Sequence, residues 1–187
     1  LEEVEGTARS VITVEDPVEY RIPFANQQQV NEKAGASFET LLRSAVRQDP
    51  DILLIGEIRD LFSAKAALDF ASSGHLTLST MHSANSTTAV FRLERLGVQR
   101  GAMADAILGV VAQKLLKQLC EKCRRVRPIT DEEAEWIRPF TEEVPEEVGE
   151  PVGCPACRET GFRGRTGVFE ILAFDGEVAR LVREGAS

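Results

Sequence analysis

The sequence has 187 residues, 43% of them hydrophobic and 28% charged, which is typical of a globular protein of one or two domains. Its net charge of −8 argues against a general nucleic-acid-binding protein, because a phosphate-binding surface needs clustered positive charge. No apolar run approaches the ~18 residues that a membrane span requires and no signal peptide opens the sequence, so we expect a cytoplasmic protein.

Three short apolar runs predict buried β-strands, at residues 11–14, 52–55 and 76–81. The first leads into Glu15 and Asp16, the second leads into Glu57, and the third ends at His82. Strands of this kind form parallel sheets, which place their chemistry just past the strand carboxyl ends. The sequence therefore predicts a mostly parallel sheet with one site assembled from two acidic strand ends and one histidine.

Apolar periodicity and capping residues predict four helices around these strands, over residues 38–48, 61–72, 86–96 and 102–119. The exposed face of the first helix carries Arg43 and Arg47, which are neighbours because they lie four residues apart. We interpret residues 27–31, between the first strand and the first helix, as a polar connection. The alternation of strands and helices indicates an α/β fold, and we place a domain boundary near Leu119.

All four cysteines belong to two Cys-x-x-Cys pairs, Cys120 with Cys123 and Cys154 with Cys157. Two such pairs can complete the four-sulfur shell that structural zinc prefers, leaving no open position for catalysis. Two separate dithiols, or four ordinary buried cysteines, are the alternatives. The absence of any spare cysteine favours zinc, and it also suits a reducing compartment.

The cysteine pairs enclose a small module that we assign to residues 120–160, followed by a carboxyl-terminal strand and helix over residues 161–187. Inside the module, Thr130 and Glu133 predict a capped acidic helix, which is followed by a Pro/Glu-rich linker. Basic residues surround the cysteines: Lys122, Arg124, Arg125, Arg127, Arg158, Arg163 and Arg165. Nucleic-acid or phospholipid contact is one interpretation, but without an aromatic stacking platform we favour a solvated basic rim.

The strand-end residues have several possible roles when they are considered singly. Glu15 and Asp16 could activate a water or hold a metal, and Glu57 could hold the water shell of a phosphate-bound Mg²⁺. His82 could contact a γ-phosphate. However, acids at strand ends are usually solvated or cap the next helix, and a histidine such as His75, beside a helix-ending glycine, is more often structural.

In combination these residues resemble the secretion ATPases, the hexameric motors of type II secretion and type IV pilus assembly. The resemblance covers the Asp box, the arginine segment, the Walker B motif, the His box and a late Gly-Tyr-x-Gly-Arg-x-Gly stretch, at residues 11–19, 42–51, 56–60, 74–82 and 161–170. It extends over about residues 10–184. It implies a RecA-like ATPase core into which the tetracysteine zinc module is inserted.

The resemblance implies catalytic roles for four residues. Glu15 matches the glutamate proposed to polarise the attacking water, and Glu57 matches the Walker B glutamate that holds Mg²⁺ through water. His75 and His82 match the His-box pair near the nucleotide and the subunit interface.

It also implies a set of nucleotide-binding residues. Arg43 and Arg47 match arginines that reach phosphates of a neighbouring subunit. We also assign Asp16 of the Asp box and Arg59 of the Walker B motif to cofactor binding. The implied cofactors are structural Zn²⁺ and Mg²⁺ with ATP. The implied partners are ATP, identical subunits in a homo-hexamer, an inner-membrane platform protein and cytoplasmic secretion-system subunits, with no nucleic acid, for a protein peripheral to the inner membrane.

The sequence departs from the family pattern in one respect, because the Walker A loop is missing. No Gly-Lys dipeptide occurs among the 187 residues. Without that loop the phosphates lose their main cradle. We therefore expect the carboxyl-terminal part of a longer ATPase, lacking an amino-terminal regulatory domain as well, that is inactive by itself.

Three functional hypotheses follow. The first is a fragment of a type II secretion ATPase that powers pseudopilus assembly, with a type IV pilus-extension ATPase as its variant. The second is a stand-alone zinc-stabilised interaction module that retains a degenerate ATPase core. The third is a nucleic-acid-binding zinc protein, which the net negative charge of the chain disfavours.

Overall fold

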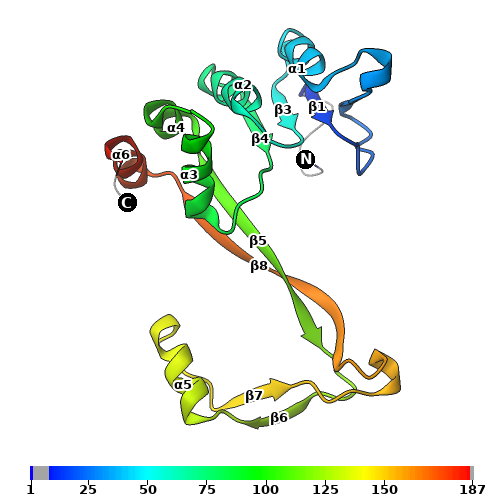
Figure 1. The fold of residues 1–187 in the computed structure, drawn as a ribbon, viewed down its shortest axis with the longest axis vertical. Coiled ribbons are helices and arrows are strands. Elements are labelled where there is room, and N and C mark those ends of the chain that lie inside the picture. The colour runs from blue at the N-terminus through cyan, green and yellow to red at the C-terminus, as the bar shows by residue number, and fades with distance from the viewer. Residues whose placement is uncertain (2–8, 186–187) are drawn as a thin grey trace. The chain divides into compact units, whose positions relative to one another are not determined.

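A computed structural model describes Leu1 and residues 9–185 of the chain (Figure 1). The chain forms two compact units. Unit 1 comprises residues 1–112 and 170–187, and unit 2 comprises residues 113–169. The divisions fall inside two long strands, whereas the domain boundaries that we placed near residues 119 and 161 fall at the ends of those strands.

Unit 1 contains a parallel four-stranded sheet in the order β2-β1-β3-β4. The strands are β1 (Val11–Glu15), β2 (Asn26–Gln29), β3 (Ile52–Ile55) and β4 (Leu76–Ser79). Val14 pairs with Ile55, which in turn pairs with Ser79, so the carboxyl ends of β1, β3 and β4 lie level. This confirms the predicted α/β class and brings the three strand ends to one edge of the sheet.

Five α-helices of unit 1 are described: α1 (Phe38–Val46), α2 (Leu61–Ser72), α3 (Ser86–Arg95), α4 (Arg100–Ala106) and α6 (Gly176–Glu184). A short 3-10 turn, η1 (Glu32–Ala34), precedes α1. The core includes Leu42, Leu53, Ile55 and Met103, all of which are fully buried. Leu172, Phe174 and Val182, from the carboxyl-terminal segment, pack against this core.

The helix-capping predictions for α1, α2 and α3 are confirmed. Ser37 caps α1 by accepting a hydrogen bond from the Thr40 N–H, and Asn85 caps α3 in the same way. Helix α2 spans the predicted residues and is followed by Gly74, while Gly97 follows α3; both glycines have positive φ. Side chains that accept capping hydrogen bonds and left-handed glycines fix these ends locally, which is why the sequence predicts them well.

Two elements of unit 1 differ from the sequence predictions. Residues 27–29, from the stretch that we interpreted as a polar connection, belong to the edge strand β2 together with Asn26. The predicted helix over residues 102–119 is present as far as Ala106, where α4 ends, but it is wrong beyond that point, because β5 (Gly109–Leu119) follows. Strand β5 pairs with β8 (Phe162–Ala173), so backbone pairing with a distant segment overrides the local helical pattern.

Strands β5 and β8 run in opposite directions. Near one end, the Phe174 N–H donates to the Leu108 carbonyl (3.0 Å), and at the other end the Cys120 N–H donates to the Gly161 carbonyl (2.9 Å). Both strands pass from unit 1 into unit 2. They are therefore the two chain connections between the units.

Unit 2 contains a second strand pair and one α-helix. The elements are β6 (Arg125–Pro128), α5 (Asp131–Ile137), β7 (Glu147–Glu150) and the 3-10 turns η2 (Arg138–Phe140) and η3 (Pro155–Cys157), with β6 and β7 antiparallel. The predicted capping box of Thr130 and Glu133 is present. The predicted Pro/Glu-rich linker is wrong in part, because its last residues form the strand β7, which pairs with β6.

Arg127 joins the elements of unit 2 by ion pairs. Its guanidinium donates two hydrogen bonds to Glu133 (2.7 and 2.8 Å) and one to Glu150 (3.1 Å). The hydrogen bonds from Arg127 lower the pKa of the Glu133 carboxyl to about 2.

Within the described residues, no helix is both long and apolar enough to cross a membrane.

Candidate active site and metal centre

A cavity of about 370 Å³ opens at the carboxyl ends of β1, β3 and β4. Its polar lining includes Glu15, Asp16, Glu57, Arg59, Thr80 and His82. Five of these are predicted site residues, contributed by three different strand ends. The structure therefore brings most of the predicted strand-end site together in one cavity.

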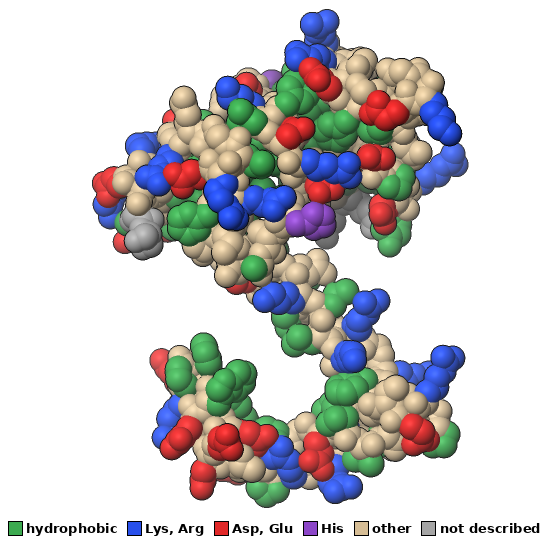
Figure 2. Space-filling view, in the orientation of Figure 1, with side chains coloured by type: hydrophobic (Ala, Val, Ile, Leu, Met, Phe, Trp, Pro, Cys, Tyr) green, Lys and Arg blue, Asp and Glu red, His purple; other side chains and the backbone are tan. Residues whose placement is uncertain are grey.

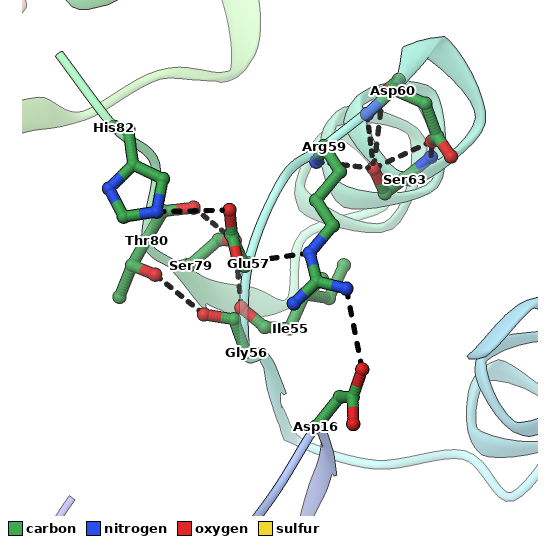
Figure 3. Close-up of polar contacts among 10 residues, drawn as sticks. All are labelled: Asp16, Ile55, Gly56, Glu57, Arg59, Asp60, Ser63, Ser79, Thr80 and His82. Carbon is green, nitrogen blue, oxygen red and sulfur yellow. Dashed lines mark hydrogen bonds and ion pairs between the residues drawn. The ribbon is translucent and has the colours of Figure 1, made fainter. Parts of the chain in front are cut away.

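Glu57 lies at the centre of a chain of charged contacts across this cavity (Figure 3). One of its oxygens accepts a hydrogen bond from Arg59 Nε (3.0 Å), and the other lies 3.3 Å from His82 Nε2. The Arg59 guanidinium also donates to Asp16 Oδ2 (3.3 Å). The hydrogen bond to Glu57 and its negative charge raise the pKa of Arg59 above its ordinary value. Glu57 is thus oriented from two sides by groups that stabilise a carboxylate.

Glu15 is held differently, by two neutral donors. Its Oε1 accepts hydrogen bonds from Thr13 Oγ1 (2.7 Å) and Gln27 Nε2 (3.0 Å). Thr13 is fully buried, and Gln27 also donates to the Tyr20 carbonyl (2.9 Å). Sequence reasoning missed both donors, although a threonine within an otherwise apolar strand was a visible signal. This fixing of one oxygen orients the other for a further contact.

Gly56 allows the ends of β1 and β3 to approach each other closely. A Cβ atom at this position would lie 3.1 Å from the Val14 carbonyl oxygen and 3.2 Å from Glu15 Cα. The Gly56 N–H donates to the same carbonyl (2.8 Å), and the Thr80 hydroxyl donates to the Gly56 carbonyl (2.6 Å). Any larger residue would push apart the backbone that positions Glu15 and Glu57.

The segment that carries His82 is anchored on both sides. Before it, the Ile58 N–H donates to the Thr80 carbonyl (2.8 Å). After it, the backbone N–H of Ser86 donates to the Glu170 carboxylate (3.0 Å), which reaches α3 from β8. His82 itself is largely exposed, with 85% of its side chain accessible, so it is free to meet a ligand at the cavity mouth.

The other predicted catalytic histidine, His75, lies elsewhere. It precedes the first residue of β4 and is therefore at the opposite edge of the sheet from His82. Its ring stacks on Phe70 with a centroid separation of 4.5 Å, and its Nδ1 lies 2.9 Å from the Ser73 hydroxyl. The structure does not bring His75 into the cavity of Glu57.

Arg43 and Arg47 also lie outside that cavity. They line a second hollow of about 490 Å³ between α1 and α2, whose lining includes Phe62 and Lys65. The Arg43 guanidinium lies 4.9 Å from the centre of the Phe62 ring. Phe70 and Ser73, the two residues that hold the His75 ring, line the same hollow. The predicted site residues of unit 1 therefore form two groups.

Unit 2 brings the four cysteines together. The sulfur atoms of Cys120, Cys123, Cys154 and Cys157 all lie within 4.8 Å of one another, and three of the separations are 3.8 to 4.0 Å. A tetrahedral metal with metal–sulfur bonds of ~2.3 Å places its sulfurs about 3.8 Å apart. The cluster therefore has the size and donor set of a tetrathiolate metal site.

Backbone N–H groups point at the sulfurs of this cluster. The N–H groups of Cys154 and Gly161 each lie 3.2 Å from Cys157 Sγ, and the Gly153 N–H lies 3.4 Å from Cys123 Sγ. Burial opposes ionisation of Cys157, but these backbone donors outweigh it and lower the pKa of the thiol to about 6. Burial dominates at Cys123 and raises its pKa to about 11. A bound cation would favour the thiolate at both residues.

Comparison with known proteins identifies the family of the chain. The family described as "Type II/IV secretion system protein" matches residues 1–187. The chain belongs to this family.

Relatives within the family come from both secretion and pilus systems. The chain is 41% identical over 185 residues to the Type II secretion system protein HxcR of Pseudomonas aeruginosa, covering 99% of this chain and 36% of that protein. It is 39% identical over 179 residues to the Type IV pilus assembly ATPase TfpB of Acinetobacter baylyi, covering 95% of this chain and 31% of that protein. The chain thus spans about a third of the length of these relatives.

Two solved structures share the fold of this chain. The pilus retraction motor PilT, solved with bound ADP, superposes with a TM-score of 0.65 at 24% identity, covering 95% of this chain and 42% of that one. The ATPase DotB of Legionella pneumophila gives a TM-score of 0.62 at 22% identity, covering 98% and 42%. At these identities the likeness concerns the fold.

Proposed function

We propose that this chain is the carboxyl-terminal part of an ATPase that powers type II protein secretion through pseudopilus assembly. The observation that carries the proposal is the position of Glu57, held between Arg59 and His82 at a strand end, in a chain that matches a secretion family throughout. In this assignment the whole protein is cytoplasmic and reaches the inner membrane through its platform protein and cytoplasmic secretion-system subunits.

The cavity residues suit phosphoryl transfer, which needs charge neutralisation and a placed water rather than covalent chemistry. Glu57 would hold Mg²⁺ through its water shell, and the bound metal would neutralise charge on the phosphates. Glu15 would orient the attacking water with its second carboxylate oxygen. Arg59 and Asp16 keep the Glu57 carboxylate in place, and His82 is exposed at the cavity mouth to meet the γ-phosphate.

The second group of predicted site residues supports action in a ring of subunits. Arg43 and Arg47 line the hollow between α1 and α2, away from Glu57. In a homo-hexamer the contact between neighbours joins two different surfaces of the chain. The hollow of one subunit would then face the cavity of the next, so that its arginines and His75 complete the nucleotide site.

The open edge of the sheet supports the view that more chain completes the ATPase. Among the described strands, the sheet ends at β2 on one side and at β4 on the other. β2 is entirely polar, as expected of a solvated edge, whereas β4 alternates leucine with threonine and serine and carries neither a charge nor a proline that would block pairing. Such an edge favours pairing with a further strand. The phosphate-binding loop would come from chain outside these 187 residues, and we expect the isolated chain to hydrolyse little ATP.

The tetracysteine cluster would hold structural zinc. Four sulfurs in a closed shell leave no coordination position for water, so the metal would stabilise unit 2 rather than act on ATP.

Substitution Glu57→Gln in the full-length protein tests the proposal. Replacing the carboxylate by an amide removes the metal-facing charge while keeping the side-chain volume, so ATP turnover should fall by about a hundredfold or more. Circular dichroism and thermal unfolding should be unchanged. Glu184→Gln, on the exposed face of α6, is the matched control and should keep full turnover. Normal turnover in Glu57→Gln would remove this residue from the mechanism.

A type IV pilus-extension ATPase is the second candidate, and the relative from Acinetobacter baylyi favours it. Loss of pili, with protein secretion intact, in a strain carrying Glu57→Gln would establish this candidate instead.

A further inference from the structure

Two large aromatic side chains stand in solvent in unit 2. Trp136 of α5 is 73% exposed and Phe140 of η2 is 78% exposed. The two rings contact each other, with centroids 6.0 Å apart and planes tilted by 55°. Figure 2 shows hydrophobic side chains gathered over α5 with acidic side chains beside them. An exposed pair of this size is costly in water, and such pairs typically anchor protein contacts.

The surroundings of this aromatic pair are strongly acidic. Residues 131–150 contain nine acidic residues and one basic residue, Arg138. Glu133 and Glu150 are paired with Arg127, and within the described residues the other seven acids make no ion pair. Glu132 and Glu135 lie on α5 within one turn of Trp136. The negative charge is therefore available to a partner instead of being used inside unit 2.

We propose that this face of α5 and η2 docks a basic amphipathic helix of a partner protein. Leucine-type side chains on such a helix would cover the rings of Trp136 and Phe140, and lysines or arginines flanking them would meet the unpaired acids. The ring centroids lie 6.0 Å apart, which is close to the separation of neighbouring side chains at positions i and i+4 on a facing helix. This inference concerns unit 2 alone and does not rest on the proposed ATPase activity.

The negative charge of this face favours a basic helix over two other possible partners. An anionic membrane surface and a nucleic acid both offer apolar or aromatic contacts, but both would be repelled by the seven unpaired acids. A small surface with two aromatic anchors suits a weak, reversible contact rather than a permanent one.

Trp136 provides the measurement, because it is the only tryptophan among the 187 residues. The full 187-residue chain, loaded with zinc, is titrated with a synthetic helix of leucine and lysine whose leucines repeat at i, i+3, i+4 and i+7. Docking should shift the tryptophan emission to shorter wavelength in a saturable way. Raising the salt from about 0.05 M to about 0.5 M should weaken binding roughly tenfold, because the charges are exposed.

Two variants keep the tryptophan and remove one half of the surface each. Phe140→Ala removes an exposed ring and should weaken binding at least tenfold. The double change Glu132→Lys with Glu135→Lys should weaken it at least as much by repulsion. The matched control, Glu177→Lys with Glu184→Lys, reverses two charges on α6 and should bind like the unchanged chain.

Several outcomes would overturn the proposal. One is an equal emission shift with a scrambled peptide of the same composition. Another is normal binding of the helix by the variant with Glu132→Lys and Glu135→Lys. Phosphatidylglycerol vesicles that shift the emission in place of the peptide would assign the face to a membrane. An emission shift with protein concentration alone would assign it to a second copy of the chain.

Discussion

Glu15 is held by two neutral donors, the buried hydroxyl of Thr13 and the amide of Gln27, which reach the same carboxylate oxygen. Glu57, in contrast, is held by Arg59 and His82, which carry or can carry positive charge. Neutral donors fix the position of a carboxylate oxygen without compensating its charge, whereas a guanidinium does both. This difference supports the proposed roles, in which Glu15 would orient the attacking water and Glu57 would face a cation.

The contribution of Thr13 can be measured by the substitution Thr13→Val, which removes only the hydroxyl. In the full-length protein we expect ATP turnover to fall about tenfold, because Glu15 loses one of its two orienting bonds. The free energy of unfolding should change by less than about 1.5 kcal/mol.

Thr77→Val in β4 is the matched control for that experiment. The Thr77 hydroxyl is buried and has no partner among the described residues, so its removal should leave turnover unchanged and raise the stability of the 187-residue chain by up to about 1 kcal/mol. Equal losses of turnover in both variants would mean that Thr13 acts only through stability.

The charged residues of the cavity could be predicted from the sequence, but the neutral donors that hold Glu15 could not. Glu15, Asp16, Glu57 and His82 follow apolar strands, and the parallel-sheet rule places such residues together. Gln27 could not be found in this way, because its contact with Glu15 depends on the pairing of β2 with β1. A strand made only of asparagine and glutamine carries no hydrophobic signal.

At the scale of elements, helix α2 begins at a cap that should respond to pH. The Asp60 carboxylate accepts a hydrogen bond from the Ser63 N–H (2.8 Å), and this bond lowers the pKa of Asp60 below its ordinary value. A lowered pKa means that the stabilisation is present above the unfolded-state value of 3.8 and is lost as the pH falls below it.

We therefore expect Asp60→Ala to reduce the free energy of unfolding by about 1 kcal/mol at pH 7. The difference from the unchanged chain should shrink as the pH is lowered below 3.8 in urea unfolding experiments. Asp60→Asn, which keeps an uncharged capping oxygen, should lose much less stability at pH 7. A difference that grows towards low pH would contradict this account of the cap.

Elements with local stop signals were predicted well, and those decided by distant partners were not. Helices α2 and α3 begin at side chains that accept capping hydrogen bonds and end near left-handed glycines. In β5, residues such as Leu115, Leu116 and Leu119 mimic helical spacing, yet the segment is extended because β8 pairs with it from about fifty residues further along the chain. No local pattern contains that information.

At the scale of the whole molecule, the two units differ in what holds them together. The hydrophobic core cluster draws its buried residues from unit 1, whereas the buried apolar side chains of unit 2 among the described residues are Cys120 and Cys157. A unit of 57 residues with so small a hydrophobic core needs a further source of stability, such as a bound metal. A metal held by the four cysteines would provide it.

We accordingly expect about one zinc per purified chain by elemental analysis. Chelation should unfold unit 2 and leave unit 1 intact, which hydrogen exchange resolved along the sequence would show as lost protection in residues 113–169 only. Cys157→Ser should reproduce this loss without chelator. Absence of metal in the purified protein, or unchanged protection of unit 2 after chelation, would remove the tetrathiolate site.

The pairing of β5 with β8 has a consequence for how this protein can be engineered. The chain leaves unit 1 on β5 and returns on β8, which is hydrogen-bonded to it, so the two cut points at residues 112 and 170 lie on neighbouring strands. A short hairpin turn could close that gap in place of all 57 residues, with no change to the spacing of the ends. Unit 2 could therefore be deleted from unit 1, or exchanged for another domain, without redesigning the sheet that bears Glu57.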